Sequence, residues 1–207
     1  MYSECMDYIA ECEAFLKSKI KDPYRVAHSF RVVNIGKKIA HEEGMNEQDL
    51  IVACLLHDIS YCQTFKTQEE WLNHGRKSAQ MVREFLQSIH YPSKHIPDIC
   101  FAIAIHVDLK ADFEGEYTPF TQSVQEADNI DRVGAYRLYE TLESVGFSAQ
   151  SIDVQKEYVE STLKTLNEYL TYDCSTKTAT KLWKDRIQFQ IDFYRRLQEQ
   201  MKISTSV

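Results

Sequence analysis

The chain has few of the residues that interrupt helices, with only 6 glycines and 4 prolines among 207 residues. Sandwiches and barrels need many tight turns, so this scarcity argues against both architectures. Sustained alternation of polar and apolar residues over strand length is also missing, which argues against a sheet. We therefore predict an all-α fold in which residues 1–207 form a single helical domain.

Cysteine pairs and long hydrophobic runs are missing as well. The six cysteines include no C-x-x-C pair, so we predict neither a disulfide framework nor a zinc knuckle. The longest apolar run, Leu50 to Leu56, is far too short to span a bilayer, and no basic and apolar leader opens the chain. We therefore expect a cytoplasmic protein with no membrane partner.

An excess of positive charge is missing too, because the formal net charge is −7. An acidic surface repels the phosphate backbone, so long DNA or RNA is not an expected partner. Small nucleotides stay candidates, because a bound metal ion reverses the field around it.

Helix signals dominate what is present. Asp22 followed by Pro23 begins one helix, Gly44 ends it, and Thr67 with Glu70 forms a capping box that begins another. The predicted helices span about residues 3–19, 22–43, 46–58, 67–88, 98–106, 121–144, 152–172 and 182–201, with a long loop at 107–120 and a link at 175–180. The C-terminal helices either pack over the bundle or form the contact of a homodimer, and the sequence leaves both open.

Histidines and aspartates interrupt the apolar faces of five consecutive predicted helices. His28 shares a face with Val32 and Ile35, and His57 ends a face that begins at Leu50. The polar residues on or next to these faces are His28, His57, Asp58, His74, His106, Asp128 and Asp131. The other histidines lie near helix ends or in connections, and we assign no role to His41, His90 and His95.

Two interpretations of these faces compete. A single histidine on an apolar face is usually a core residue with a hydrogen-bond partner. An inward aspartate is costlier, because a buried carboxylate needs a cation or hydrogen-bond donors. A shared divalent cation satisfies the whole group, and imidazole with carboxylate suits Fe, Mn, Co, Ni or Zn. The candidate ligands of a first ion are His28, His57, Asp58 and Asp128, and those of a second ion are His74 and His106, which otherwise contact a substrate phosphate.

The order His28, His57–Asp58, Asp128 resembles the HD superfamily of metal-dependent phosphohydrolases. The segments that carry the resemblance are RVAHSFRVV (25–33), ACLLHDIS (53–60), HGRKSAQMV (74–82), AIAIH (102–106) and EADNIDRVGA (126–135). The dipeptide alone is a weak signal, whereas these elements in order make a strong one. The resemblance covers about residues 23–144, so the helices at about 150–202 are predicted to be a C-terminal extension of this HD core.

The resemblance implies an all-α bundle with one or two divalent transition metal ions. His28, His57, Asp58 and Asp128 would then ligate the first ion. His74 and His106 would help to bind a second ion, which Asp58 would bridge to the first. The similarity is closest to a branch that cleaves nucleotide pyrophosphates and to the symmetrical diadenosine tetraphosphate hydrolases. Alarmone hydrolases follow HD with an acidic pair, whereas Ile59 and Ser60 stand here, which argues against that substrate.

The expected function is hydrolysis of a phosphoester or phosphoanhydride bond in a small nucleotide-like substrate. Asp58 is the candidate for orienting the attacking water, and Arg25 is a candidate to bind a phosphate oxygen or, equally, to form a surface salt bridge. The candidate substrate-binding residues are Arg25, Arg76, Lys77, Asp131 and Arg132. Asp131 is equally a candidate hydrogen-bond partner of a metal-binding histidine. The aromatic residues in the loops after the metal-binding segments either stack a base or close the bundle; they are Tyr61, Phe65, Phe113 and Tyr117.

Two other functions stay open on the sequence. One is a regulatory or ligand-binding HD protein that keeps its metal without turnover. The other is oxidation at a di-iron centre, as in an oxygenase-type HD protein.

Overall fold

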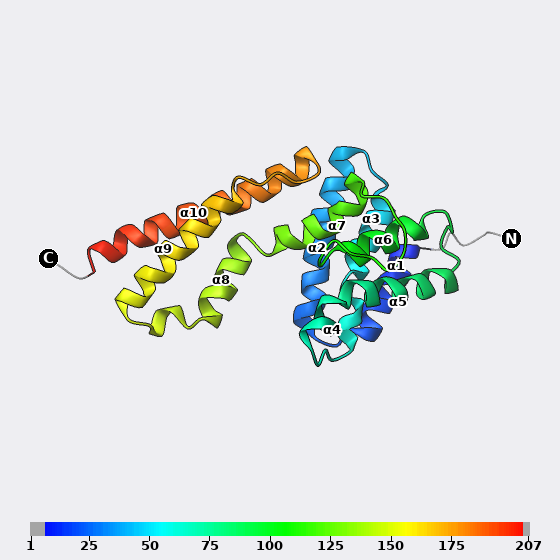
Figure 1. Cartoon of the computed structure of the whole chain (residues 1–207), viewed down its shortest axis with the longest axis horizontal. Coiled ribbons are helices and arrows are strands. Elements are labelled where there is room, and N and C mark those ends of the chain that lie inside the picture. Colours follow the sequence, from blue (N-terminus) through cyan, green and yellow to red (C-terminus); the bar gives the residue numbers. More distant parts are fainter. Residues whose placement is uncertain (1–6, 205–207) are drawn as a thin grey trace. The chain divides into compact units, whose positions relative to one another are not determined.

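The computed structural model describes residues 7–204, and within that range every regular element is a helix (Figure 1). The predicted all-α fold is confirmed. The elements are α1 (Tyr8–Lys19), α2 (Pro23–Glu43), α3 (Glu47–Leu56), the 3-10 helix η1 (Ile59–Cys62), α4 (Gln68–Leu72), α5 (His74–Ser88), α6 (Ile96–Ile105), α7 (Pro119–Asp131), α8 (Ala135–Ser144), the 3-10 helix η2 (Phe147–Ala149), α9 (Ile152–Tyr169) and α10 (Lys177–Lys202).

The chain divides into two compact units, of which the first ends at Asp128 and the second begins at Asn129. That the whole chain forms a single domain stays a prediction. None of the helices in residues 7–204 is long and apolar enough to cross a membrane.

In the first unit, polar caps begin the helices where the sequence predicts them. The side chain of Asp22 accepts a hydrogen bond from the backbone N–H of Tyr24 at 2.9 Å, at the start of α2. Asn46 caps α3 in the same way, accepting from the backbone N–H of Asp49 at 3.2 Å. Gly44 ends α2 in the left-handed conformation, with φ of 67°, which glycine adopts without steric cost.

The core of the first unit is formed by α3 and α6. The side chains of α3 from residue 49 to 56 are all buried, as are those of α6 from residue 99 to 105. The remaining helices surround this pair: α3 packs against α1, α2 and α6, and α5 packs against α6 and η1. His57 and His106, which directly follow the last residues of α3 and α6, are buried as well.

Two of the predicted helices are each broken in two. The helix expected at 67–88 ends at Leu72, and α5 begins at His74. The side chain of Asn73, which lies between the two helices, accepts a hydrogen bond from the guanidinium of Arg76. The helix expected at 121–144 is interrupted before α8 by Gly134, whose φ of 102° is not helical.

Smaller differences affect three further boundaries. The loop expected after Asp58 begins with η1, and α10 starts at Lys177 because Thr176 caps it by accepting from the backbone N–H of Ala179 at 3.1 Å. The predicted link at 175–180 is therefore largely helical. The first predicted helix is observed from Tyr8 onward, and its expected start at Ser3 lies outside the described residues.

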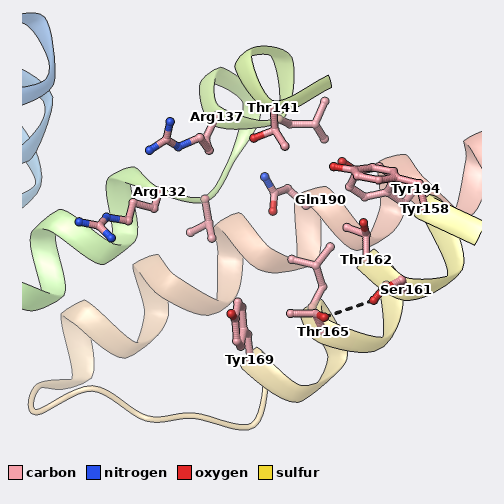
Figure 2. Close-up of a pocket in the computed structure, with 13 residues that line it drawn as sticks. Arg132, Arg137, Thr141, Tyr158, Ser161, Thr162, Thr165, Tyr169, Gln190 and Tyr194 are labelled. Carbon is pink, nitrogen blue, oxygen red and sulfur yellow. Dashed lines mark hydrogen bonds between the residues drawn. The ribbon is translucent and has the colours of Figure 1, made fainter. Parts of the chain in front are cut away.

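The second unit consists mainly of α8, α9 and α10, with α9 packed along α10 (Figure 1). Its core includes buried side chains of α9 and α10, among them Val159, Leu166, Ile187 and Ile191. A groove of about 280 Å³ lies between these helices, and Figure 2 shows the residues that line it. Gln190, one of the residues that line it, is buried and donates from Nε2 to the carbonyl of Gly134 at 3.1 Å. The homodimer contact expected on these helices stays a prediction.

Candidate metal centre

Six polar side chains from five helical segments meet inside the first unit. His57 and His106 follow directly after the last residues of α3 and α6, and His74 is the first residue of α5. Each of the six is at most 6% exposed; they are His28, His57, Asp58, His74, His106 and Asp128. The structure thus brings together every residue that the sequence predicts as a metal ligand.

Three of the histidines are fixed by the same local contact. Nδ1 of His57 lies 2.7 Å from the carbonyl oxygen of Cys54, three residues earlier. His74 and His106 repeat this contact with the carbonyl oxygens three residues before them, at 2.6 Å and 2.7 Å. A carbonyl oxygen can only accept, so Nδ1 of each ring carries a proton, and Nε2 presents a lone pair whenever the ring is neutral. A backbone contact of this kind fixes the tautomer and orientation of metal-binding histidines.

The Nε2 atoms of these rings converge without enough protons to satisfy them. Nε2 of His74 lies 3.1 Å from Nε2 of His106, so two lone pairs face each other unless a proton or a cation lies between them. Nε2 of His57 is buried and has no hydrogen-bond partner within the described part of the chain. A buried acceptor left in this state is costly. The arrangement therefore fits a cation.

Asp58 stands between two groups of histidines. Its Oδ1 lies 3.2 Å from Nε2 of His74 and 3.5 Å from Nε2 of His106. Its Oδ2 lies 3.6 Å from Nε2 of His57 and 3.9 Å from Nε2 of His28. Each carboxylate oxygen thus faces a different pair of rings, as a carboxylate that bridges two cations would.

Asp128 completes the group around His28 and His57. Its Oδ1 lies 3.2 Å from Nε2 of His28 and 4.0 Å from Nε2 of His57. Three sets of three residues each offer ligand atoms within 4.8 Å of one another: His28, His57 and Asp58; His57, His106 and Asp128; and Asp58, His74 and His106. The donor set is imidazole and carboxylate, which suits divalent transition metals.

Burial and charge set the protonation of the centre. Burial lowers the pKa of His57 to about 4, so its ring is neutral at pH 7. Burial would raise the pKa of Asp58, but His57 and hydrogen bonds from His106 and His74 hold it well below its usual range. Burial would lower the pKa of His106, but its bond to Asp58 and the negative charges of Asp58 and Asp128 together raise it. A neutral His57 and an ionised Asp58 are the states that bind a metal.

Gly75 allows α5 to approach the end of α6 closely. A Cβ at this position would lie 2.8 Å from the carbonyl oxygen of Ala104 and 3.0 Å from that of Ile103. It would also lie 3.1 Å from Nδ1 of His106. The carbonyl of Ile103 is the one that holds His106, so only glycine at position 75 leaves this contact undisturbed. This explains physically why a glycine follows His74.

Among the predicted substrate-binding residues, Arg25 lies at the centre. Its Nη1 donates to Oδ2 of Asp58 at 3.3 Å, and its side chain is 31% exposed. Arg76 instead donates to Asp108 at 2.8 Å and binds Asn73, so it ties the loop after α6 to the start of α5. The ammonium of Lys77 lies over the ring of Phe65, 5.9 Å from its centroid. Substrate binding by these three cations stays a prediction.

Asp131 and Arg132 belong to the second unit. Asp131 is buried at the end of α7, whereas Arg132 is exposed and lines the groove shown in Figure 2. Contact of either residue with substrate stays a prediction.

The aromatic residues of the loops fall into two groups. Tyr117 donates to the carbonyl of Leu109 at 2.6 Å and packs edge-on against Phe101, as does Phe113. These contacts close the loop over α6. Tyr61, by contrast, lies against the ring of His74, with centroids 5.1 Å apart.

Sequence reasoning missed the residues whose backbone carbonyls hold the three rings, which are Cys54, Trp71 and Ile103. Nothing about their side chains in the sequence marks this backbone role. The signal that finds them is the fixed spacing of three residues before each histidine at a helix terminus.

Comparison with known proteins identifies the family of the chain. A model of the HD domain family matches residues 25–133, more than half of the 207-residue chain. The protein therefore belongs to the HD domain family. It is similar to the crystal structure of a predicted HD superfamily hydrolase from an uncultured Thermotogales bacterium, with a TM-score of 0.64 and 22% sequence identity. That similarity covers 92% of this chain and 91% of the other. No curated protein matches the chain.

Proposed function

We propose that this protein is a metal-dependent phosphohydrolase that cleaves a phosphoester or phosphoanhydride bond in a small nucleotide-like substrate. The observation that carries the proposal is Nε2 of His57, a buried lone pair with no hydrogen-bond partner in residues 7–204 that faces two carboxylates. Membership of the HD domain family supports it, as does the similar structure described as a predicted HD superfamily hydrolase.

The six residues have distinct expected roles. His28, His57 and Asp128 would hold one cation, and His74 and His106 a second, with one oxygen of Asp58 directed to each. A divalent cation here would lower the pKa of a water molecule and polarise a phosphoryl oxygen. The fit to Fe, Mn, Co, Ni or Zn comes from the donor atoms, and one or two ions are compatible with them.

Hydrolysis forms a bond between a water oxygen and phosphorus and breaks the bond between phosphorus and the leaving oxygen. Asp58 is ionised at neutral pH because its pKa is lowered, so it can accept a hydrogen bond from that water and orient it. The proton that the water loses passes to the leaving group or to solvent. Arg25, which reaches Asp58, is placed to bind a phosphate oxygen through its planar guanidinium.

The test is a combined measurement of metal content and phosphate release. Purified protein is analysed by mass spectrometry for bound metals and screened against nucleotides and dinucleoside polyphosphates. We expect His57→Ala and Asp58→Ala to lose metal and to reduce hydrolysis by at least about 100-fold. The matched control is His41→Ala, because His41 is an exposed histidine that also contacts a carboxylate, Glu47, at 2.9 Å. Unchanged metal content and activity in both site variants would refute the assignment.

Two other results would point to different functions. Stoichiometric metal with no release of phosphate from any compound would indicate a binding protein without turnover. Oxygen consumption by the reduced, iron-loaded form would indicate an oxygenase-type centre.

A further inference from the structure

The guanidinium of Arg25 lies flat on an aromatic ring beside the metal centre. Cζ of Arg25 is 3.6 Å from the centroid of the Tyr61 ring, while Nη1 of Arg25 reaches Oδ2 of Asp58 at 3.3 Å. A cation stacked at this distance is attracted by the ring quadrupole. The plane of the guanidinium is therefore set by Tyr61, and its edge is directed by Asp58.

Tyr61 is itself held in place from a different helix. Nε1 of Trp71 in α4 donates to the hydroxyl of Tyr61 at 2.9 Å. The Tyr61 ring also packs edge-on against Phe65 and His74, with centroid distances of 5.0 Å and 5.1 Å. With contacts on its hydroxyl and on its edges, the ring has little freedom to turn.

The stack also bears on what Tyr61 can contact. The face of the ring that Arg25 covers is not available to a nucleobase, so the simplest role of Tyr61 is to hold the arginine. An arginine side chain has several rotatable bonds, and about a third of this one is exposed. Without a support, its plane would not be fixed relative to the centre.

We propose that Tyr61, supported by Trp71, is a positioning residue that holds the Arg25 guanidinium for a phosphate group bound at the metal centre. The proposal rests on the proposed function, because it assigns Arg25 to the substrate phosphate. It adds a pair of residues that act through Arg25 and not on the metal. The effect of Tyr61 and Trp71 on phosphate binding can therefore be measured separately from metal binding.

The experiment is a double-mutant cycle on the manganese-loaded protein. Affinity for inorganic phosphate is measured by calorimetry for wild type, Tyr61→Leu, Arg25→Ala and the double variant. Where the phosphate-release screen gives a substrate, KM and kcat are measured too. We expect Tyr61→Leu to weaken phosphate binding and raise KM by about 3- to 30-fold, with unchanged metal content. In the Arg25→Ala background it should have no further effect.

Two conservative variants and one control sharpen the cycle. Tyr61→Phe removes the hydroxyl and Trp71→Phe removes Nε1, so each abolishes the hydrogen bond between them while an aromatic ring stays at both positions. Both should weaken phosphate binding by the same factor, which should be smaller than that of Tyr61→Leu. The double variant should not weaken it further than either substitution alone. The control is Phe113→Leu, because Phe113 stacks with Arg83 at 4.8 Å, an arginine contact of the same kind outside the centre. It should leave phosphate affinity unchanged.

Several results would overturn the proposal. An equal effect of Tyr61→Leu with and without Arg25 would show that Tyr61 does not act through the arginine. Loss of metal in Tyr61→Leu would show that it supports the ligands instead. A wild-type protein that binds manganese and phosphate but hydrolyses nothing would overturn the proposed function alone, since the binding cycle would still decide the role of Tyr61.

Discussion

The packing of α2 against α3 can be tested by adding one methyl group. Gly36 of α2 is buried against α3, and a Cβ at this position would lie 2.5 Å from Sγ of Cys54, a distance that real contacts do not show. Its next neighbours, Cβ of Cys54 and Cγ of Leu50, would be at ordinary distances of 3.6 Å and 3.7 Å. The clash therefore involves one sulfur atom, and we expect Cys54→Ala to relieve it.

The magnitude follows from two opposing effects. Overpacking of a filled core costs about 1–3 kcal/mol, and alanine is favoured over glycine within a helix by about 1 kcal/mol. Gly36→Ala alone should therefore lower the free energy of unfolding by about 0–2 kcal/mol. With Cys54→Ala present it should be neutral or stabilising. Because helix propensity cancels in the cycle, the coupling energy should be about 1–3 kcal/mol.

The assay is urea unfolding of metal-free protein followed by tryptophan fluorescence. The chain has 2 tryptophans, and Trp183→Phe leaves Trp71 as a reporter within the first unit. All four proteins of the cycle carry this background. Additivity of the two substitutions within about 0.5 kcal/mol would refute the reasoning. Since the carbonyl of Cys54 holds Nδ1 of His57, Gly36→Ala should also weaken manganese binding, and Cys54→Ala should restore it.

Three further predictions concern the centre, the thiols and the pH dependence of stability. Gly75→Ala should lower manganese affinity by about 10- to 100-fold in calorimetry, because its Cβ would crowd the backbone that holds His106; an unchanged affinity would contradict this. Burial raises the pKa of the Cys12 thiol to about 12, so mass spectrometry after brief alkylation should find exposed Cys62 labelled and Cys12 unlabelled; equal labelling would contradict it. Burial and the hydrogen bond to Asp49 raise the pKa of Tyr91, so the folded state holds this proton more tightly. The contribution of Tyr91 to stability should be constant below a pH of about 10 and then fall by up to about 1.4 kcal/mol per pH unit, and Tyr91→Phe should reduce the alkaline slope measured in urea unfolding curves.

The inward positions of the metal centre are predictable from the sequence because helical spacing is regular. His28 lies one turn before Val32 in α2, and both are buried as their shared face requires. His57 and His106 each end a run that is apolar on all sides, and the structure places both at the ends of buried helices. Periodicity therefore identifies which side chains point inward, and the resemblance to a family indicates that they meet.

Helix breaks could not be predicted with the same ease, because they depend on single backbone conformations. Gly134 adopts a φ of 102° and ends one predicted helix, although an isolated glycine is also tolerated inside helices. Asn73 lies between α4 and α5 and its side chain accepts a hydrogen bond from Arg76, a residue that the sequence predicts at the substrate. Contacts of this kind join segments through side-chain geometry that no periodic pattern encodes.

The roles of charged residues near the centre are the part that sequence constrains least. Arg25 and Arg76 each lie within three residues of a histidine of the centre, His28 and His74. Arg25 nevertheless reaches Asp58, whereas Arg76 is bound by Asp108. The difference arises from the loops that meet each guanidinium. The stack of Arg25 on Tyr61 likewise depends on η1, a segment that the sequence predicts only as a loop.

The most direct test of the account is anomalous scattering from crystals grown with manganese. Data collected on both sides of the metal absorption edge locate the ion and identify it at once. We predict an anomalous peak within coordination distance of Nε2 of His57, and a carboxylate oxygen of Asp58 bound to the same ion. A map with no peak there, in which a water molecule or a side chain satisfies Nε2 of His57, would contradict the claim that this cluster is a metal centre.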